Sequence, residues 1–136
     1  MAGPLKIKVQ LLCGGEVAMG PGKADLLDAI AEHGSISAAA RAMGMSYRRA
    51  WQLVDMMNRC WAEPIIETSP GSARGKGAQL TGFGADVLGR YRALLAKLEC
   101  AGGDGDAAAL STMLRCEPLH SQADRTAEIE APDQTD

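Results

Sequence analysis

Two arginines and a glutamine at the start of one helical pattern could read a DNA sequence. Arg48, Arg49 and Gln52 fall in the first two turns of the pattern over 47–61. Arginine can hold O6 and N7 of guanine with two hydrogen bonds, and glutamine can do the same with N6 and N7 of adenine. An α-helix fits the major groove, and its N-terminal turns make the base contacts. We therefore predict that these side chains contact base edges. The alternative is an ordinary solvated helix face.

Two hydroxyl side chains come directly before the arginines. Ser46 is a natural N-cap residue, and Tyr47 is the first residue of the predicted helix. The N-terminus of a helix favours anions, and serine and tyrosine hydroxyls commonly bind phosphate oxygens. We predict that Ser46 and Tyr47 contact the DNA backbone.

A second cationic element lies in the glycine-rich loop over 69–77. Arg74 and Lys76 alternate there with glycines, which let a backbone approach a phosphate or the minor groove closely. Beside a helix-turn-helix this loop is typical of a wing, and we predict that both residues contact DNA. A flexible basic surface loop is the alternative. A nucleotide-binding loop is not indicated, because no Ser or Thr follows the lysine.

Catalytic and metal-binding patterns are absent from the sequence. The two histidines, His33 and His120, are far apart, and no two cysteines have the short spacing of a zinc site. We expect no catalytic residue, no metal and no cofactor, and hence no enzyme. Cys60 lies in an apolar helical pattern and is expected in the core.

The remaining patterns describe the elements that must hold these residues. Leu5–Leu11 alternates between apolar and polar residues, which predicts a strand. Gly44 supplies a turn residue between two helices, and Thr81 is a natural N-cap for the last long helix. The predicted elements are a strand over 5–11, helices over 23–32, 37–43 and 47–61, two short strands at 65–68 and 78–81, a helix over 82–98 and a weak helix over 107–115. The fold class is mainly α with a small β wing: a winged helix-turn-helix with an N-terminal strand and a long C-terminal helix.

The helix over 47–61 must also bury one face. Ala50, Val54 and Met57 recur on that face at three- and four-residue steps, and Trp51 and Trp61 lie near them. We predict that Trp51 is a bulky core anchor beneath the reading helix. Trp61 is expected to be less completely buried, because it stands at the helix end.

The helix over 82–98 has more apolar surface than a small domain requires. Its apolar stripe consists of Val87, Leu88, Tyr91, Leu94, Leu95 and Leu98. We predict that this stripe forms a homodimer interface, although burial against the helix over 23–32 is the alternative. A two-fold dimer places its reading helices roughly 34 Å apart, which predicts a pseudo-palindromic site on double-stranded DNA.

Charge divides the chain into two parts. The formal net charge of −3 is the sum of +3 over residues 1–99 and −6 over residues 100–136. The second part also carries several glycines and prolines, so we predict a DNA-binding and dimerisation domain over 1–99 and an acidic, largely disordered tail over 100–136. No apolar run approaches the roughly 18–20 residues that span a membrane. We expect a cytoplasmic protein without a membrane partner.

The run Gly34–Trp51 reads G-S-I-S-x-A-A-x-x-x-G-x-S-Y-x-x-A-W, and it resembles the winged-helix domain of the ModE family of molybdate-responsive transcriptional regulators. The likeness covers residues 5–99. It implies operator binding as a dimer, with DNA contacts on the residues already singled out above, and it implies a link to molybdate transport. Full-length family members continue into paired β-domains that hold molybdate. Residues 100–136 show no strand pattern of that kind, so we expect no small-molecule site in this chain. A winged-helix protein-interaction module without specific DNA binding is the alternative function.

Overall fold

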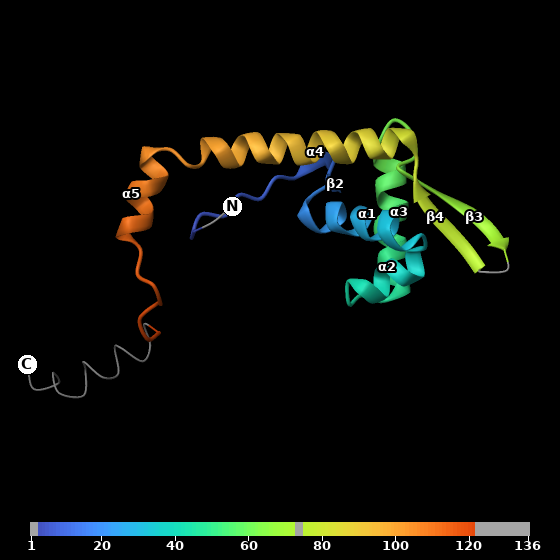
Figure 1. The fold of residues 1–136 in the computed structure, drawn as a ribbon, viewed down its shortest axis with the longest axis horizontal. Coiled ribbons are helices and arrows are strands. Elements are labelled where there is room, and N and C mark those ends of the chain that lie inside the picture. The colour runs from blue at the N-terminus through green and yellow to red at the C-terminus, as the bar shows by residue number, and fades with distance from the viewer. Residues whose placement is uncertain (1–2, 73–74, 122–136) are drawn as a thin grey trace, which may run out of the picture.

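The computed structural model describes residues 3–72 and 75–121 (Figure 1). The fold is mainly helical with two short antiparallel strand pairs, as predicted for a winged helix-turn-helix. In chain order the elements are β1 (Leu11–Cys13), β2 (Glu16–Met19), α1 (Pro21–His33), α2 (Ile36–Ala42), α3 (Tyr47–Cys60), β3 (Ile66–Ser72), β4 (Gly75–Leu80), α4 (Gly82–Ala101) and α5 (Gly105–Met113). Among the described residues, no helix is long and apolar enough to cross a bilayer.

Local sequence signals set the boundaries of the helix-turn-helix. Gly34 ends α1 in the left-handed conformation at φ 75°, and Gly44 takes φ 69° in the turn between α2 and α3. Ser35 caps α2 by accepting a hydrogen bond from the Ala38 amide. Ser46 caps α3, as predicted. Glycine suits both turns because a side chain would be strained at positive φ.

The core lies where α1, α2 and α3 meet the first half of α4. Small residues line the contact between α2 and α3, where Ala39, Ala40 and Ala50 are buried. Their short side chains let the two helix backbones approach closely. The largest fully buried side chains are Met19, Leu26, Leu27, Ile30, Met57 and Ile65.

The N-terminal strand predicted over Leu5–Leu11 begins later in the structure. Residues 5–10 form no regular element, and β1 starts at Leu11. Gly14 and Gly15 form the turn of a hairpin, with Gly14 at φ 59°, and β2 pairs with β1 after this turn. Alternation alone does not make a strand, because the backbone also needs a partner strand, and no strand of the described residues pairs with 5–10.

The segment before β1 is held by α4. The Tyr91 hydroxyl donates a hydrogen bond of 2.9 Å to the Val9 carbonyl. Further out, the side chains of Leu5 and Ile7 lie against Gly102, where an added Cβ would come within 3.0 Å of them. Figure 1 shows this N-terminal segment running beneath α4. The segment therefore packs on a helix far away in the sequence.

The start of α4 is packed tightly on the residues before the wing. The Thr81 hydroxyl caps α4 by accepting a bond from the Gly84 amide and donates to the Pro64 carbonyl at 2.6 Å. A Cβ on Gly84 would lie 2.2 Å from the Ile65 carbonyl oxygen. Glycine is therefore required at this crossing by a close backbone approach, although its φ is ordinary.

Candidate nucleic-acid interface

Three of the predicted DNA-contacting residues and one tryptophan lie together on the outward face of α3. Tyr47, Arg48, Trp51 and Gln52 line one shallow hollow on the surface. They lie at one-turn steps along the helix, opposite the buried Ala50 and Val54. An exposed face with a cation, an amide and two aromatic rings can donate hydrogen bonds and also make apolar contacts with bases.

The prediction that Trp51 is a core anchor is wrong. Its side chain is 47% exposed, and the neighbouring Tyr47 is 51% exposed. The buried residues of α3 are Ala50, Val54 and Met57 instead. Both aromatic rings are therefore free to contact a partner.

Trp61 has the opposite role from Trp51. It is half-buried, as expected, and its indole nitrogen donates a bond of 3.0 Å to the Ala18 carbonyl of β2. Trp61 thereby fixes the end of α3 to the β1–β2 hairpin. Of the two tryptophans, only Trp61 is structural.

Arg49 points away from the hollow that its neighbour Arg48 lines. Its amide donates to the Ser46 hydroxyl at 3.0 Å, and its side chain lines a separate hollow together with Lys8 and Lys23. The structure therefore separates the two predicted base-reading arginines onto different sides of α3. Pattern reasoning did not single out Lys8 and Lys23, because they are far from α3 in the sequence.

The wing is an antiparallel hairpin beside α3. Ile66 of β3 pairs with Leu80 of β4, and the strands extend further toward the tip than predicted, to Ser72 and Gly75. Of the two predicted wing cations, Lys76 belongs to β4, and Arg74 lies outside the described residues. The Ala78 amide donates to the Gly34 carbonyl at 2.9 Å, which ties β4 to the end of α1.

Asn58 connects the reading helix to the wing. Its side-chain oxygen accepts bonds from the Ile65 and Ile66 amides at 2.8 and 3.0 Å, and its side-chain nitrogen donates to the Ile66 carbonyl at 3.1 Å. The side chain thus acts like one more strand residue beside β3. An asparagine inside an amphipathic pattern carries no local signal for this role, since its partners lie seven and eight residues away.

All four cysteines are free thiols. Cys60 is half-buried, so it is less deeply placed than predicted, and Cys13, Cys100 and Cys116 are exposed. Burial, followed by the hydrogen bond and charge of the neighbouring Cys13, raises the pKa of the Cys60 thiol. Within residues 3–72 and 75–121, no group of three His, Cys, Asp or Glu side chains could hold an ion.

The stripe predicted for the dimer is divided by the structure. Val87, Leu88 and Tyr91 are buried within a single protomer against the rest of the domain. Leu94 and Leu98 are 39% and 38% exposed, and Leu95 is partly exposed. Figure 1 shows the helices of the domain body beneath the first half of α4 only, which agrees with the exposure of Leu94 and Leu98 in the second half.

Comparison with known proteins shows what this arrangement is similar to. Residues 23–85, which run from α1 to the start of α4, match the model of bacterial regulatory helix-turn-helix proteins of the lysR family. The molybdenum-pterin-binding protein MopB of Rhodobacter capsulatus is 45% identical over 76 residues, which are 56% of this chain and 28% of that protein. The chain carries a ModE-like winged helix-turn-helix domain.

Two further relatives carry the ModE name. The molybdenum transport protein ModE of Azotobacter vinelandii is 42% identical over 69 residues, 51% of this chain and 26% of its own length. The DNA-binding transcriptional dual regulator ModE of Escherichia coli K12 is 35% identical over 98 residues, 69% of this chain and 37% of its own. The chain therefore spans between about a quarter and somewhat more than a third of these relatives. The likeness covers the ModE-like domain and not their remaining length.

Proposed function

We propose that this protein is a transcriptional regulator that binds double-stranded DNA through its ModE-like domain. The observation that carries the proposal is the exposed face of α3, on which Arg48 and Gln52 stand beside two solvent-exposed aromatic rings. Arg48 and Gln52 would bond base edges in the major groove, and Ser46 and Tyr47 lie at the helix N-terminus, where phosphates bind. The E. coli relative is named as a DNA-binding transcriptional regulator.

Several elements support α3 in this role. Asn58 fixes the wing relative to α3, and the predicted wing cation Lys76 belongs to β4 of the hairpin beside the reading helix. Arg74, the second predicted wing cation, stays a proposed DNA contact from the sequence. A recognition helix works only if the neighbouring contacts hold its orientation on the duplex. The function is binding and not catalysis, and the regulator acts in the cytoplasm on genes of molybdenum metabolism, a link that rests on the names of the relatives.

The proposal includes a homodimer built on the second half of α4. Leu94, Leu95 and Leu98 leave an exposed apolar edge there. Two copies joined along this edge would present two α3 helices to one face of the duplex and would read a pseudo-palindromic operator. Val87, Leu88 and Tyr91, which are buried within the protomer, would support the interface from beneath.

A binding experiment over a range of salt concentrations tests the function. The duplexes are a sequence selected by the protein from a random library and an unselected duplex of equal length. We expect the affinity to fall steeply with salt on both, and to be at least about a thousandfold higher on the selected sequence. Equal affinity for both duplexes would contradict a specific regulator. The absence of binding to either would favour the alternative, a winged-helix module that binds another protein.

A further inference from the structure

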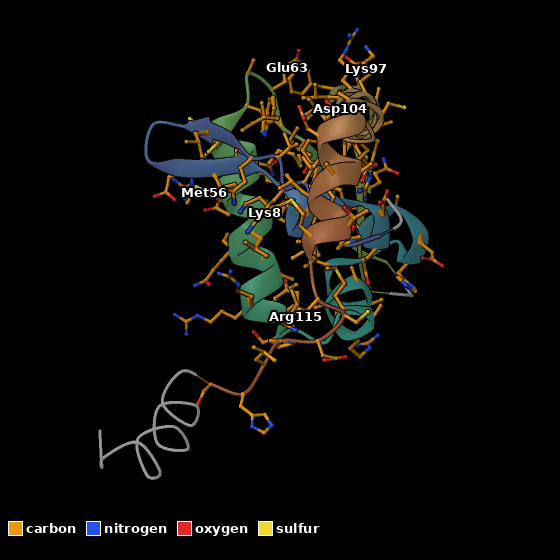
Figure 2. The ribbon with its side chains drawn as sticks, turned by 90° about the vertical axis from the view of Figure 1, so that its left-hand side faces the viewer. Lys8, Met56, Glu63, Lys97, Asp104 and Arg115 are labelled. Carbon is orange, nitrogen blue, oxygen red and sulfur yellow. The ribbon has the colours of Figure 1, made fainter. Side chains whose placement is uncertain are left out.

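Three cations from distant parts of the sequence meet on the side of α3 that faces β2. Lys8 comes from the extended segment before β1, Lys23 from the first turn of α1, and Arg49 from α3, and all three line one hollow. Figure 2 shows Lys8 next to α3 on the side where Met56 lies, whereas Lys97 stands at the top of the view, on α4. We refer to Lys8, Lys23 and Arg49 as the basic cluster.

No carboxylate neutralises the basic cluster within the described part of the chain. None of its three side chains makes an ion pair or a side-chain hydrogen bond there, whereas Arg59, Arg90 and Arg92 are each paired with an aspartate. Glu16 and Asp55 line the adjoining hollow with Lys23 and Arg49, but Asp55 is already bonded to Arg59 at 3.0 Å, and Glu16 makes no ion pair with the cluster within the described residues. The first turn of α1 adds no acidic residue either. The cluster therefore presents uncompensated positive charge to solvent.

The position of the cluster relative to the reading face suggests its partner. Arg49 is adjacent to Arg48. Gln52 lines the hollow that it shares with Tyr47, Arg48 and Trp51, which we call the reading hollow, and it also lines a hollow shared with Lys23 and Arg49. Figure 1 shows the wing on one side of α3, and the N-terminal segment and β2 on the other. The major groove is about 12 Å wide, so a helix in it has a phosphate backbone close by on each side.

We propose that the basic cluster binds the DNA backbone on the side of the major groove opposite the wing. The proposal rests on the DNA-binding function and adds residues to it. Lys8 and Lys23 become phosphate-binding residues, and Arg49 moves from base reading to phosphate binding. The domain would then hold the duplex by one cationic contact on each side of α3, which fixes the depth and angle of the helix in the groove.

Charge removal at single positions tests the proposal. Lys23→Gln and Lys8→Gln each delete one cation of the cluster, and Lys97→Gln deletes an exposed cation of α4 as the matched control. The probes are the selected duplex and the unselected duplex of equal length. Each cluster variant should lower the affinity for both duplexes by the same factor. It should also reduce the slope of log affinity against log salt by about 0.9, because one fewer counterion is released. Lys97→Gln should leave the slope unchanged.

Other outcomes would overturn the proposal. A slope unchanged from the wild type in both cluster variants, with the wild type binding DNA, would refute the cluster but leave the proposed function standing. A loss confined to the selected duplex would show base contact in place of phosphate contact. If the wild type binds neither duplex, both proposals fail together. Lys8 lies outside every helix and strand, so Lys8→Gln keeps the test valid even if Lys23→Gln lowers stability.

Discussion

The side chain of Asn58 bonds to both the amide and the carbonyl of Ile66, at 3.0 and 3.1 Å, and so joins the reading helix to the first strand of the wing. A third bond, from the Ile65 amide, completes the set. These three bonds hold the first strand of the wing against α3. The proposed DNA contacts of α3 and the wing need that arrangement to be fixed.

Asn58→Ala should therefore lower the free energy of unfolding by about 2–3 kcal/mol, because two amides and a carbonyl lose their partner in a half-buried site. Urea denaturation measures the change. Asn58→Asp is the matched variant: a carboxylate still accepts from both amides but cannot donate to the Ile66 carbonyl, so its loss should be smaller. A free energy of unfolding for Asn58→Ala within about 0.5 kcal/mol of the wild-type value would show that these bonds contribute little to stability.

The hydroxyl of Tyr91 makes the stability dependent on pH in the alkaline range. Burial raises the pKa of Tyr91 above its ordinary value of 10.0, and its proton lies in the bond to the Val9 carbonyl. The folded state holds this proton more tightly than the unfolded state. The contribution of the Tyr91 hydroxyl to the free energy of unfolding is therefore complete below about pH 10 and is lost as the pH rises further.

Tyr91→Phe should cost about 1 kcal/mol at neutral pH and should then lose less stability than the wild type as the pH rises above about 10. Denaturation at several pH values measures both effects. Tyr47→Phe, which alters an exposed tyrosine, serves as the control and should follow the wild type. Parallel pH profiles for wild type and Tyr91→Phe would contradict the assignment.

The exposed half of α4 predicts a dimer that can be broken without unfolding the protomer. Leu98→Glu places a charge on a side chain that is 38% exposed in the protomer, so the fold should persist while the second copy is lost. Sedimentation should show a dimer for the wild type and a monomer for the variant. Ala96→Glu, at another exposed position of α4, should remain dimeric. A wild type that is monomeric at high concentration would refute the interface.

Local signals explain why much of the fold could be predicted from the sequence. Capping residues such as Ser46 and Thr81 bond within one helical turn. Gly34 and Gly44 stand at positions where the backbone takes a positive φ. These features do not depend on distant residues. The sequence was sufficient to place the helix-turn-helix, the wing and the start of α4.

The misplaced features depend on contacts between distant elements. Trp51 fits a broad apolar stripe on α3 by its position in the sequence. In the folded protein Ala50 is buried and Trp51 is exposed, and this difference depends on how α3 packs on the other helices. Likewise, the apolar repeat of α4 continues past Tyr91, but the residues that bury the helix do not extend that far. The sequence pattern alone could therefore not separate the core residues of α4 from its exposed ones. The basic cluster and the bonds of Asn58 are formed between segments whose proximity the sequence does not reveal.

The exposure of Trp51 leads to a prediction about thymine. An apolar ring on the reading face can contact the C5-methyl group of thymine in the major groove. Replacing one contacted thymine of the selected duplex by deoxyuridine removes that methyl group and should cost about 0.8 kcal/mol, roughly fourfold in affinity. The Trp51→Ala variant should bind the thymine and the deoxyuridine versions of the selected duplex with equal affinity. Its free energy of unfolding should stay close to that of the wild type.

Trp61→Phe supplies the contrast for this pair of tryptophans. It removes the bond to the Ala18 carbonyl and should lower stability by about 1 kcal/mol while keeping the sensitivity to the methyl group. If no thymine in the selected site responds to removal of its methyl group, Trp51 does not read thymine.

The most direct test of the account is the base preference of Arg48→Ala, compared with Arg49→Ala, in a selection from a random duplex library. Arg48 lines the reading hollow with Gln52, whereas Arg49 lies in the basic cluster. Arg48→Ala should cost about 1–3 kcal/mol on the wild-type site and relax the preference at one base pair. Arg49→Ala should weaken binding to all sequences and leave the preference unchanged. A wild-type preference retained in Arg48→Ala would contradict the claim that this face of α3 reads DNA.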